Sequence, residues 1–125
     1  MEEIPIQIVL LKNPYDTYLI ARIEERDVAP ECLLHNPYKL VEETHWTYSK
    51  EDTHNPSDNT VFLGSKEELE IRNGNENLIT QYDYLLFQKF PLHTKQTQIY
   101  LRADDILTLY DPSYEILEYY RKLTE

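Results

Sequence analysis

The side chains that could carry metal chemistry are spread thinly along this chain. Four histidines stand at positions 35, 45, 54 and 93, and none has the HxH or HxxxH spacing by which two imidazoles share one metal ion. His45, Asp52, His54 and Asp58 could converge on a metal if their loop folded around it, but solvated loop residues are the simpler interpretation. The single cysteine, Cys32, provides no thiolate pair and is predicted to be a small core residue. We therefore predict no metal site.

Acid–base and nucleophilic chemistry also lack a recognisable arrangement. The adjacent acids Glu24-Glu25, Glu42-Glu43 and Glu67-Glu68 would face opposite ways on a strand, whereas a catalytic pair has to converge. No G-x-S-x-G segment positions a serine nucleophile. Two glycines, Gly64 and Gly74, are too few for a glycine-rich phosphate loop. We therefore predict that the protein is not an enzyme and needs no cofactor.

The length and the charge of the chain limit the number of domains and the kinds of partner it can have. The 125 residues suit one compact domain, and 23 acidic against 12 basic residues give a formal charge of -11. Such a chain repels a phosphate backbone unless its few Lys and Arg gather on one face. The opening MEEIPIQIVLLK is acidic and its apolar run is short, so we predict neither an export signal nor a membrane span. A lone cysteine favours a reducing compartment. We expect a cytoplasmic protein.

Alternation of apolar and polar residues predicts the elements that would position any site. Five segments show the pattern of strands: residues 4–10, 18–24, 32–43, 78–90 and 98–110. The first two would form a hairpin, and Asn36-Pro37 marks a bulge or bend in the third. Asp111 as N-cap, Pro112 at the first helical position and Arg121-Lys122 late predict a helix over about 112–124.

Residues 44–77 differ from the rest. The segment is polar and longer than ordinary loops, and only Thr60-Val61-Phe62-Leu63 looks like an element of its own. It is either a disordered excursion or an ordered flap that hides Trp46 and Phe62. Because free tails seldom carry such large apolar side chains, we predict a partly ordered insertion between the third and fourth strands.

The segment IYLRADDILTLY, residues 99–110, interrupts a strand pattern with Arg102-Ala103-Asp104-Asp105. Five bent strands in so short a chain indicate a small antiparallel barrel, either of the SH3/Sm type or an OB-fold. A small residue such as Ala103 within the polar group would let the backbone kink.

The residues around this kink resemble a known signature. Leu101 to Ile106 looks like the second motif of Sm-like proteins, and Tyr18 to Asp27 resembles the first, although Ala103 and Ala21 stand where Sm proteins have glycine. Together with Leu34-His35-Asn36-Pro37, the pattern is similar to short acidic Sm-like proteins of tailed phages and marine metagenomes. The resemblance implies one Sm-like domain over 1–125, with its helix at the C-terminal end instead of the usual N-terminal one. A phage protein of this kind would work in the host cytoplasm.

The resemblance also implies an interface between copies of the chain and an RNA-binding site. Sm proteins form homo-oligomeric rings by pairing their fourth and fifth strands, which here would be residues 78–90 and 98–110. The interface residues would be Tyr82, Tyr84, Leu85, Phe87, Tyr100 and Leu101. RNA would bind in the ring at Arg102, Asp104, His35 and Asn36. The simpler alternative is that Arg102 pairs with Asp104 or Asp105 within the turn.

Two classes of function stay open. The first is a non-enzymatic Sm-like oligomeric module with RNA as a candidate ligand. The second is an acidic phage-type protein that binds or inhibits a host protein by mimicking nucleic acid, or a virion structural or assembly component. Seven of the eleven tyrosines suit a protein interface, since tyrosine buries a large ring and keeps a polar end wet, but they could also stack on bases. They are Tyr82, Tyr84, Tyr100, Tyr110, Tyr114, Tyr119 and Tyr120.

Overall fold

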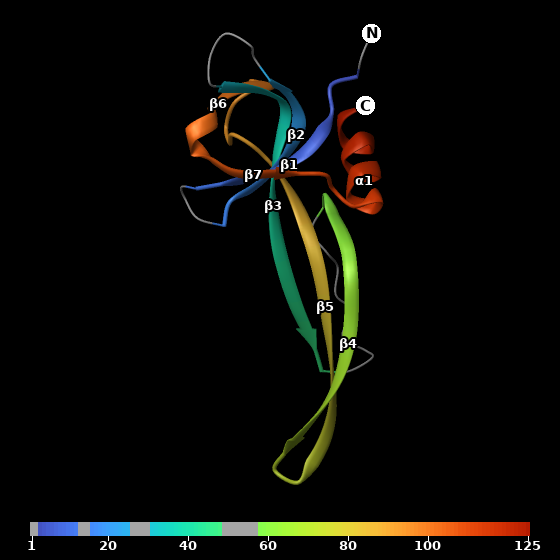
Figure 1. Ribbon diagram of the computed structural model, residues 1–125. Helices are drawn as coiled ribbons and strands as arrows, with labels where there is room; N and C mark the ends of the chain where they lie inside the picture. The colour runs from blue at the N-terminus through green and yellow to red at the C-terminus, as the bar shows by residue number, and fades with distance from the viewer. Residues whose placement is uncertain (1–2, 13–15, 26–30, 49–57) are drawn as a thin grey trace. The chain divides into compact units, whose positions relative to one another are not determined.

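The computed structural model describes residues 3–12, 16–25, 31–48 and 58–125, and this part of the chain is mainly β. Its elements, labelled in Figure 1, are β1 (Ile6–Leu11), β2 (Tyr18–Glu25), β3 (Glu31–Thr47), β4 (Thr60–Arg72), β5 (Asn75–Lys89), β6 (Gln98–Arg102), the 3-10 turn η1 (Ala103–Asp105), β7 (Ile106–Tyr110) and α1 (Tyr114–Thr124). The strands form one curled antiparallel sheet in the order β4-β5-β3-β2-β1-β7, with β6 paired to β3. The predicted class is confirmed, but the described residues contain seven strands instead of five.

The chain divides into two compact units. Unit 1 contains residues 1–40 and 87–125, and unit 2 contains residues 41–86. Strands β3 and β5 contribute residues to both units. Each unit is described by itself below.

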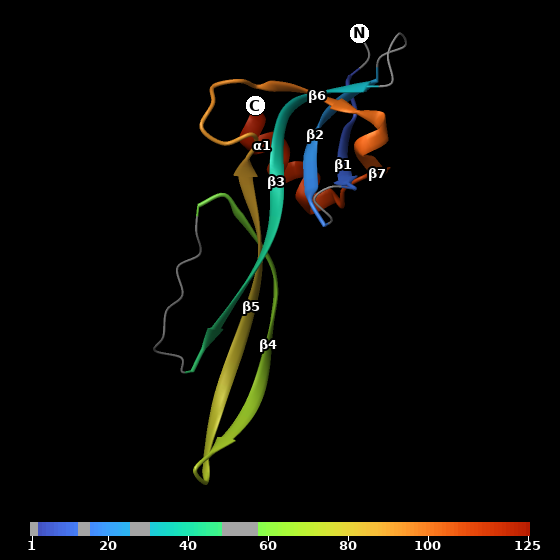
Figure 2. The same ribbon diagram turned by 90° about the vertical axis from the view of Figure 1, so that its left-hand side faces the viewer.

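Unit 1 is a curled antiparallel sheet. The strands pair in the order β7-β1-β2-β3-β6, and Figure 2 shows β1, β2 and β3 side by side. The chain passes from β6, at one end of this order, through η1 into β7 at the other end. The predicted hairpin of residues 4–10 and 18–24 is confirmed by the pairing of β1 with β2. The single strand predicted over 98–110 is two strands, because the polar residues form η1 between them.

A bulge bends β3, as the sequence predicted. Ile20 lies opposite Tyr38 and Arg22 opposite His35, so one residue of β2 faces both Asn36 and Pro37. Asn36 has a φ of 51°, the left-handed conformation that asparagine tolerates better than most residues. The residue of β2 at this position is Ala21, which is fully buried. A small side chain therefore lies where the strands bend most.

The core of unit 1 is built from the inward-facing residues of β1, β2 and β3. Its buried members are Val9, Leu11, Leu19, Ala21, Ile23, Cys32 and Leu34. The inward residues of β6 and β7, including Ile99, Leu101, Ile106 and Leu109, pack against it. Cys32 is therefore a core residue, as predicted, and burial together with the nearby Glu25 raises the pKa of its thiol.

The C-terminal helix α1 covers unit 1 through its buried residues Ile116 and Tyr120. It begins two residues later than predicted, at Tyr114, with Ser113 as the N-cap in place of Asp111. Serine caps a helix about as well as aspartate, so residue type alone did not decide between the two positions. No helix in the described parts of the chain is long and apolar enough to cross a membrane.

Unit 2 contains the long hairpin of β4 and β5. Twelve residue pairs connect the strands, from Thr60 opposite Leu86 to Arg72 opposite Asn75. The connection is Asn73-Gly74, with φ angles of 53° and 77°, as a two-residue turn of type I′ requires. Most of the predicted insertion 44–77 is therefore strand: it contains the end of β3, all of β4 and the start of β5. Residues 49–57 of the insertion lie outside the described residues.

Candidate functional site

The break between β6 and β7 gives unit 1 its most distinctive local geometry. Arg102 is the last extended residue, with φ -71° and ψ 137°, and Ile106 donates its backbone N–H to the carbonyl of Ala103. The backbone N–H of Lys12 donates to the carbonyl of Asp105 at 2.9 Å, which ties the turn to the end of β1. Because η1 redirects the chain, β6 pairs with β3 while β7 pairs with β1.

Both strands keep one edge without a partner in the described part of the chain. β6 pairs only with β3, and β7 is the last strand in the sheet order, beside β1. The exposed side chains of these strands include three large ones with apolar surface, beside the polar Gln98, Arg102 and Thr108. Tyr100 is 60% exposed, Leu107 52% and Tyr110 41%. An unpaired strand edge with exposed apolar side chains is a template for another strand.

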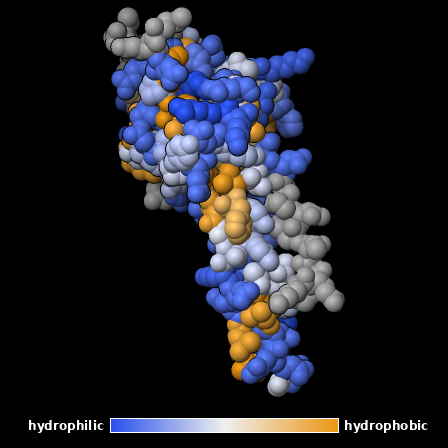
Figure 3. Space-filling model, turned by 90° about the vertical axis from the view of Figure 1, so that its right-hand side faces the viewer, coloured by the Kyte–Doolittle hydropathy of each residue, from blue (hydrophilic) through white to orange (hydrophobic). Residues whose placement is uncertain are grey.

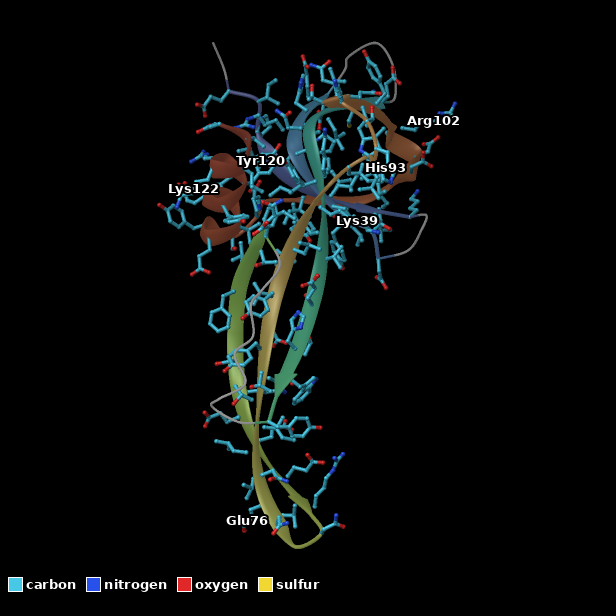
Figure 4. All side chains as sticks on the ribbon, turned by 180° about the vertical axis from the view of Figure 1, so that it is seen from behind. Lys39, Glu76, His93, Arg102, Tyr120 and Lys122 are labelled. Carbon is cyan, nitrogen blue, oxygen red and sulfur yellow. The ribbon has the colours of Figure 1, made fainter. Side chains whose placement is uncertain are left out.

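The four residues predicted to bind RNA are not brought together. Arg102 lies opposite Glu31 at one end of the β3–β6 ladder, whereas His35 lies opposite Gln98 at the other end. Four residues of strand separate these ends by about 13 Å. Figure 4 shows Arg102 pointing away from the strands, and Asp104 is exposed beside it. The predicted pairing of Arg102 with Asp104 or Asp105 is also not formed: Arg102 makes no ion pair among the described residues.

His35 and Asn36 are half-buried and instead make contacts within unit 1. The ring of His35 lies between Glu24 and Gln98, with its Nε2 3.1 Å from the Glu24 carboxylate and its Nδ1 3.0 Å from the Gln98 amide. The hydroxyl of Tyr120 donates toward the backbone carbonyls of His35 and Asn36 at 3.1 and 2.8 Å. Both residues therefore belong to the bulge of β3, and their backbone carbonyls bind the Tyr120 hydroxyl of α1.

The predicted oligomer interface needs a correction at residues 78–90. β5 lies between β4 and β3, so the edge that a ring would need there is already paired with the chain's own β4. Tyr84 is buried against Phe62 and His45, with ring centroids 5.7 and 5.8 Å apart, and Tyr82 and Leu85 are half-buried. Phe87 is 1% exposed and contacts Tyr119 at 5.0 Å, and Leu101 packs on the core of unit 1. Of the six residues, only Tyr100 lies exposed on an open edge.

No sequence pattern predicted the cluster around Arg22 that holds α1 in place. Arg22 donates from Nη1 to Thr124 Oγ1 at 2.9 Å and pairs through Nη2 with the Glu125 carboxylate at 3.1 Å. Its guanidinium also lies 5.4 Å from the centre of the Tyr120 ring, a cation–π distance. A cavity of about 540 Å³ is lined by Arg22 and Glu125 of this cluster, by Leu117 and Arg121 of α1, and by residues 3–6 at and before the start of β1. Both arginines are neutralised within the chain, because Arg121 pairs with Glu118 at 3.0 Å.

The remaining chemistry-bearing residues form no site in the described ranges. No group of three His, Cys, Asp or Glu residues there could hold a metal ion. His45 lies 3.4 Å from the Glu43 carboxylate and Asp58 is exposed, while Asp52 and His54 lie outside the described residues. The adjacent acids Glu24 and Glu25 are both exposed at the end of β2.

Burial raises the pKa of Tyr120 to about 12, although the Arg22 guanidinium favours the phenolate and opposes this rise. Figure 4 shows this side chain between α1 and the strands of unit 1. The folded state therefore holds the phenolic proton at a pH where an unfolded tyrosine, with a pKa near 10, has lost it. The stability contributed by the neutral phenol is complete below pH 10 and is lost as pH rises from 10 to 12.

We expect the free energy of unfolding to fall by about 1.4 kcal/mol per pH unit in that window because of Tyr120. The measurement is urea unfolding at a series of pH values from 8 to 12. Lysines titrate in the same range, so Tyr120→Phe is the matched control, and only the difference between the two slopes belongs to Tyr120. Parallel slopes in the two proteins would contradict the assignment.

The signals for the open edges and for the hairpin were present in the sequence. Leu107 and Tyr110 belong to the strand pattern of 98–110, but the pattern alone does not say which strand ends a sheet. Asn73-Gly74 between alternating residues is a strong short-range hairpin signal, and it lay inside the segment predicted to be an insertion.

Residues 4–125 match a family of unknown function, DUF6561. No curated protein matches the chain.

Proposed function

Since the chain belongs to DUF6561, a family without a known function, we propose a function from the geometry and from the Sm resemblance. This is a non-enzymatic module that assembles with its own copies through the open edges of β6 and β7. The observation that carries the proposal is a pair of strand edges on either side of one turn, which have no partner among the described residues of unit 1. The β6 edge of one copy would pair with the β7 edge of the next. Such a head-to-tail contact uses two different surfaces and closes into a ring when the rotation between copies permits.

Side chains beside the edges support this pairing. Tyr100, Leu107 and Tyr110 are exposed next to the open backbone, and tyrosine is among the residues enriched at protein interfaces. Soluble proteins usually protect an edge with lysine, proline or a covering element. Neither β6 nor β7 contains a lysine or a proline, and the single charged residue of the two strands is Arg102 at the end of β6. An uncovered edge with these side chains is better suited to association than to solvent.

The order of pairing also supports a barrel of the Sm type for unit 1. The resemblance of Leu101 to Ile106 to the second Sm motif falls on the β6–η1–β7 turn, where the backbone kinks. Ring formation through these strands is what that resemblance implies. We assign the interface to residues 98–110 and no longer to residues 78–90, because β4 covers the edge of β5.

RNA binding stays a prediction of the resemblance. A ring would bring together one Arg102 from each copy, but each is followed by Asp104 and Asp105 and lies across from Glu31. A charge of -11 per chain adds to the repulsion. We therefore assign self-assembly, and not nucleic-acid binding, as the function that this geometry supports best.

The test is the mass of the particle in solution. Sedimentation velocity at high micromolar concentration is expected to show one oligomer larger than a dimer for the wild-type chain. Leu107→Glu places a charge beside the paired edge, and we expect it to weaken association roughly 100-fold, because a desolvated unpaired charge costs several kcal/mol. Leu92→Glu is the matched control, since Leu92 is 54% exposed but lies in the loop before β6. A monomeric wild-type chain, or equal dissociation by both variants, would overturn the proposal.

A further inference from the structure

The end of the β4–β5 hairpin carries an apolar face. Leu69 lies directly opposite Leu78, and Ile71 follows two residues later on the same side of β4. These three side chains, named the tip face below, are 60%, 42% and 68% exposed in the order Leu69, Leu78, Ile71. Figure 3 shows hydrophobic residues gathered at the end of the hairpin. Cross-strand neighbours on one face make a continuous surface.

The opposite face of the same hairpin is charged. Lys66 lies 4.0 Å from Glu68, and Arg72 lies 3.0 Å from Glu70. These residues alternate with Leu69 and Ile71 along β4, so the two faces of this strand differ in polarity, while on β5 Ile79 shares the charged face opposite Glu68. An amphipathic hairpin of this kind is typical of a sheet that has one face against water and one against a partner.

An isolated two-stranded hairpin is only marginally stable in water and gains stability when one face is covered. Apolar patches rimmed by polar residues on an otherwise soluble surface mark interaction sites. The tip face has this composition. Glu67 and Glu76 lie at its border, and no lysine or arginine within residues 67–71 and 76–80 lies on the same side of the hairpin as the tip face. The occupant of such a face must therefore tolerate two carboxylates.

We propose that the tip face docks a protein partner that presents an apolar surface bordered by lysine or arginine. A second copy of the chain would bring four carboxylates around one apolar contact, and like charges across an interface are costly. Anionic lipid surfaces and nucleic acids would meet the same two carboxylates and the overall charge of -11. A basic rim around an apolar centre complements both features of the face. This docking goes beyond self-assembly and uses the hairpin, not the edges of β6 and β7.

The test uses two synthetic strand-forming peptides, one alternating leucine and lysine and one alternating leucine and glutamate. Binding is measured by fluorescence anisotropy at physiological salt. Wild-type protein is expected to bind the lysine peptide and not the glutamate peptide. Leu69→Thr with Ile71→Thr keeps residues that favour strands but removes the apolar surface, and we expect it to weaken binding about tenfold or more. Glu67→Gln with Glu76→Gln is expected to weaken binding about threefold.

The matched control for charge is Glu68→Gln with Glu70→Gln, which makes the same change on the opposite face and should leave binding within about 1.5-fold. Equal losses from the two glutamine pairs, or full binding by the threonine pair, would mean attraction to net charge and would overturn the proposal. Equal binding of the glutamate peptide would also overturn it. Self-association that the threonine pair abolishes would assign the face to a second copy instead. None of these outcomes depends on Leu107, so failure here is distinguishable from failure of the β6–β7 assembly.

Discussion

Replacing Tyr120 with alanine is expected to lower the free energy of unfolding by about 3–5 kcal/mol, because it removes a fully buried ring and leaves a cavity. The ring is held from three sides. Tyr38 meets it edge-on at 6.1 Å, the Arg22 guanidinium lies 5.4 Å from its centre, and its hydroxyl reaches the bulge carbonyls of His35 and Asn36. Urea unfolding at pH 7 measures the loss.

Tyr120→Phe separates the hydroxyl from the ring. It keeps the ring packed but leaves the carbonyls of His35 and Asn36 without the phenol, and a lost buried hydrogen bond costs about 1–3 kcal/mol. The phenylalanine variant should therefore lie between wild type and the alanine variant. Equal stability of the alanine variant and wild type would mean that α1 does not depend on Tyr120 for its position.

These contacts explain why α1 can cover unit 1 with a short apolar face. Ile116 and Tyr120 are its only buried residues, and one turn beyond them Thr124 accepts a hydrogen bond from Arg22. The same Arg22 lies beside the bulge of β3, whose carbonyls accept from Tyr120. The bulge and the helix are thus joined by one polar group, and neither is positioned by apolar packing alone.

Local sequence features predicted the local structure well. Alternation placed β1 and β2, Asn36-Pro37 marked the bulge, and the polar residues after Leu101 marked the break at η1. In each case the signal and the structure lie within a few residues of one another. The C-terminal helix followed from its capping residues with an error of two positions at its start.

Pairing between distant strands could not be read in the same way. The Sm resemblance placed an interface with another copy at residues 78–90, but β4 of the same chain covers that edge. Polar composition hid β4, because Lys66, Glu67 and Glu68 interrupt its apolar alternation and no residue of the strand is buried. The contact between Arg22 and Thr124 joins residues 102 positions apart, and no local pattern encodes it.

A second large effect is expected in the core, where Leu34→Ala should lower the free energy of unfolding by about 3–5 kcal/mol. Leu34 has no exposed surface and lies opposite Ile23 of β2 and Ile99 of β6, so it connects the two strands that flank β3 in unit 1. Removing its side chain leaves a cavity that these neighbours can close only by moving the strands. The measurement is urea unfolding at a protein concentration low enough to keep the chain monomeric, since association adds to apparent stability.

Leu92→Ala is the control, because Leu92 is 54% exposed and its truncation should change stability by less than about 0.5 kcal/mol. Amide hydrogen exchange adds a local readout. The backbone of β6 pairs only with β3, so the cavity at Leu34 is expected to speed exchange in residues 98–102 more than in β1, which is paired on both sides. The contrary result would be that β6 keeps its protection from exchange while the free energy of unfolding falls by several kcal/mol. In that case β6 would be held by something other than β3, and the open edge on which self-assembly depends would already be occupied.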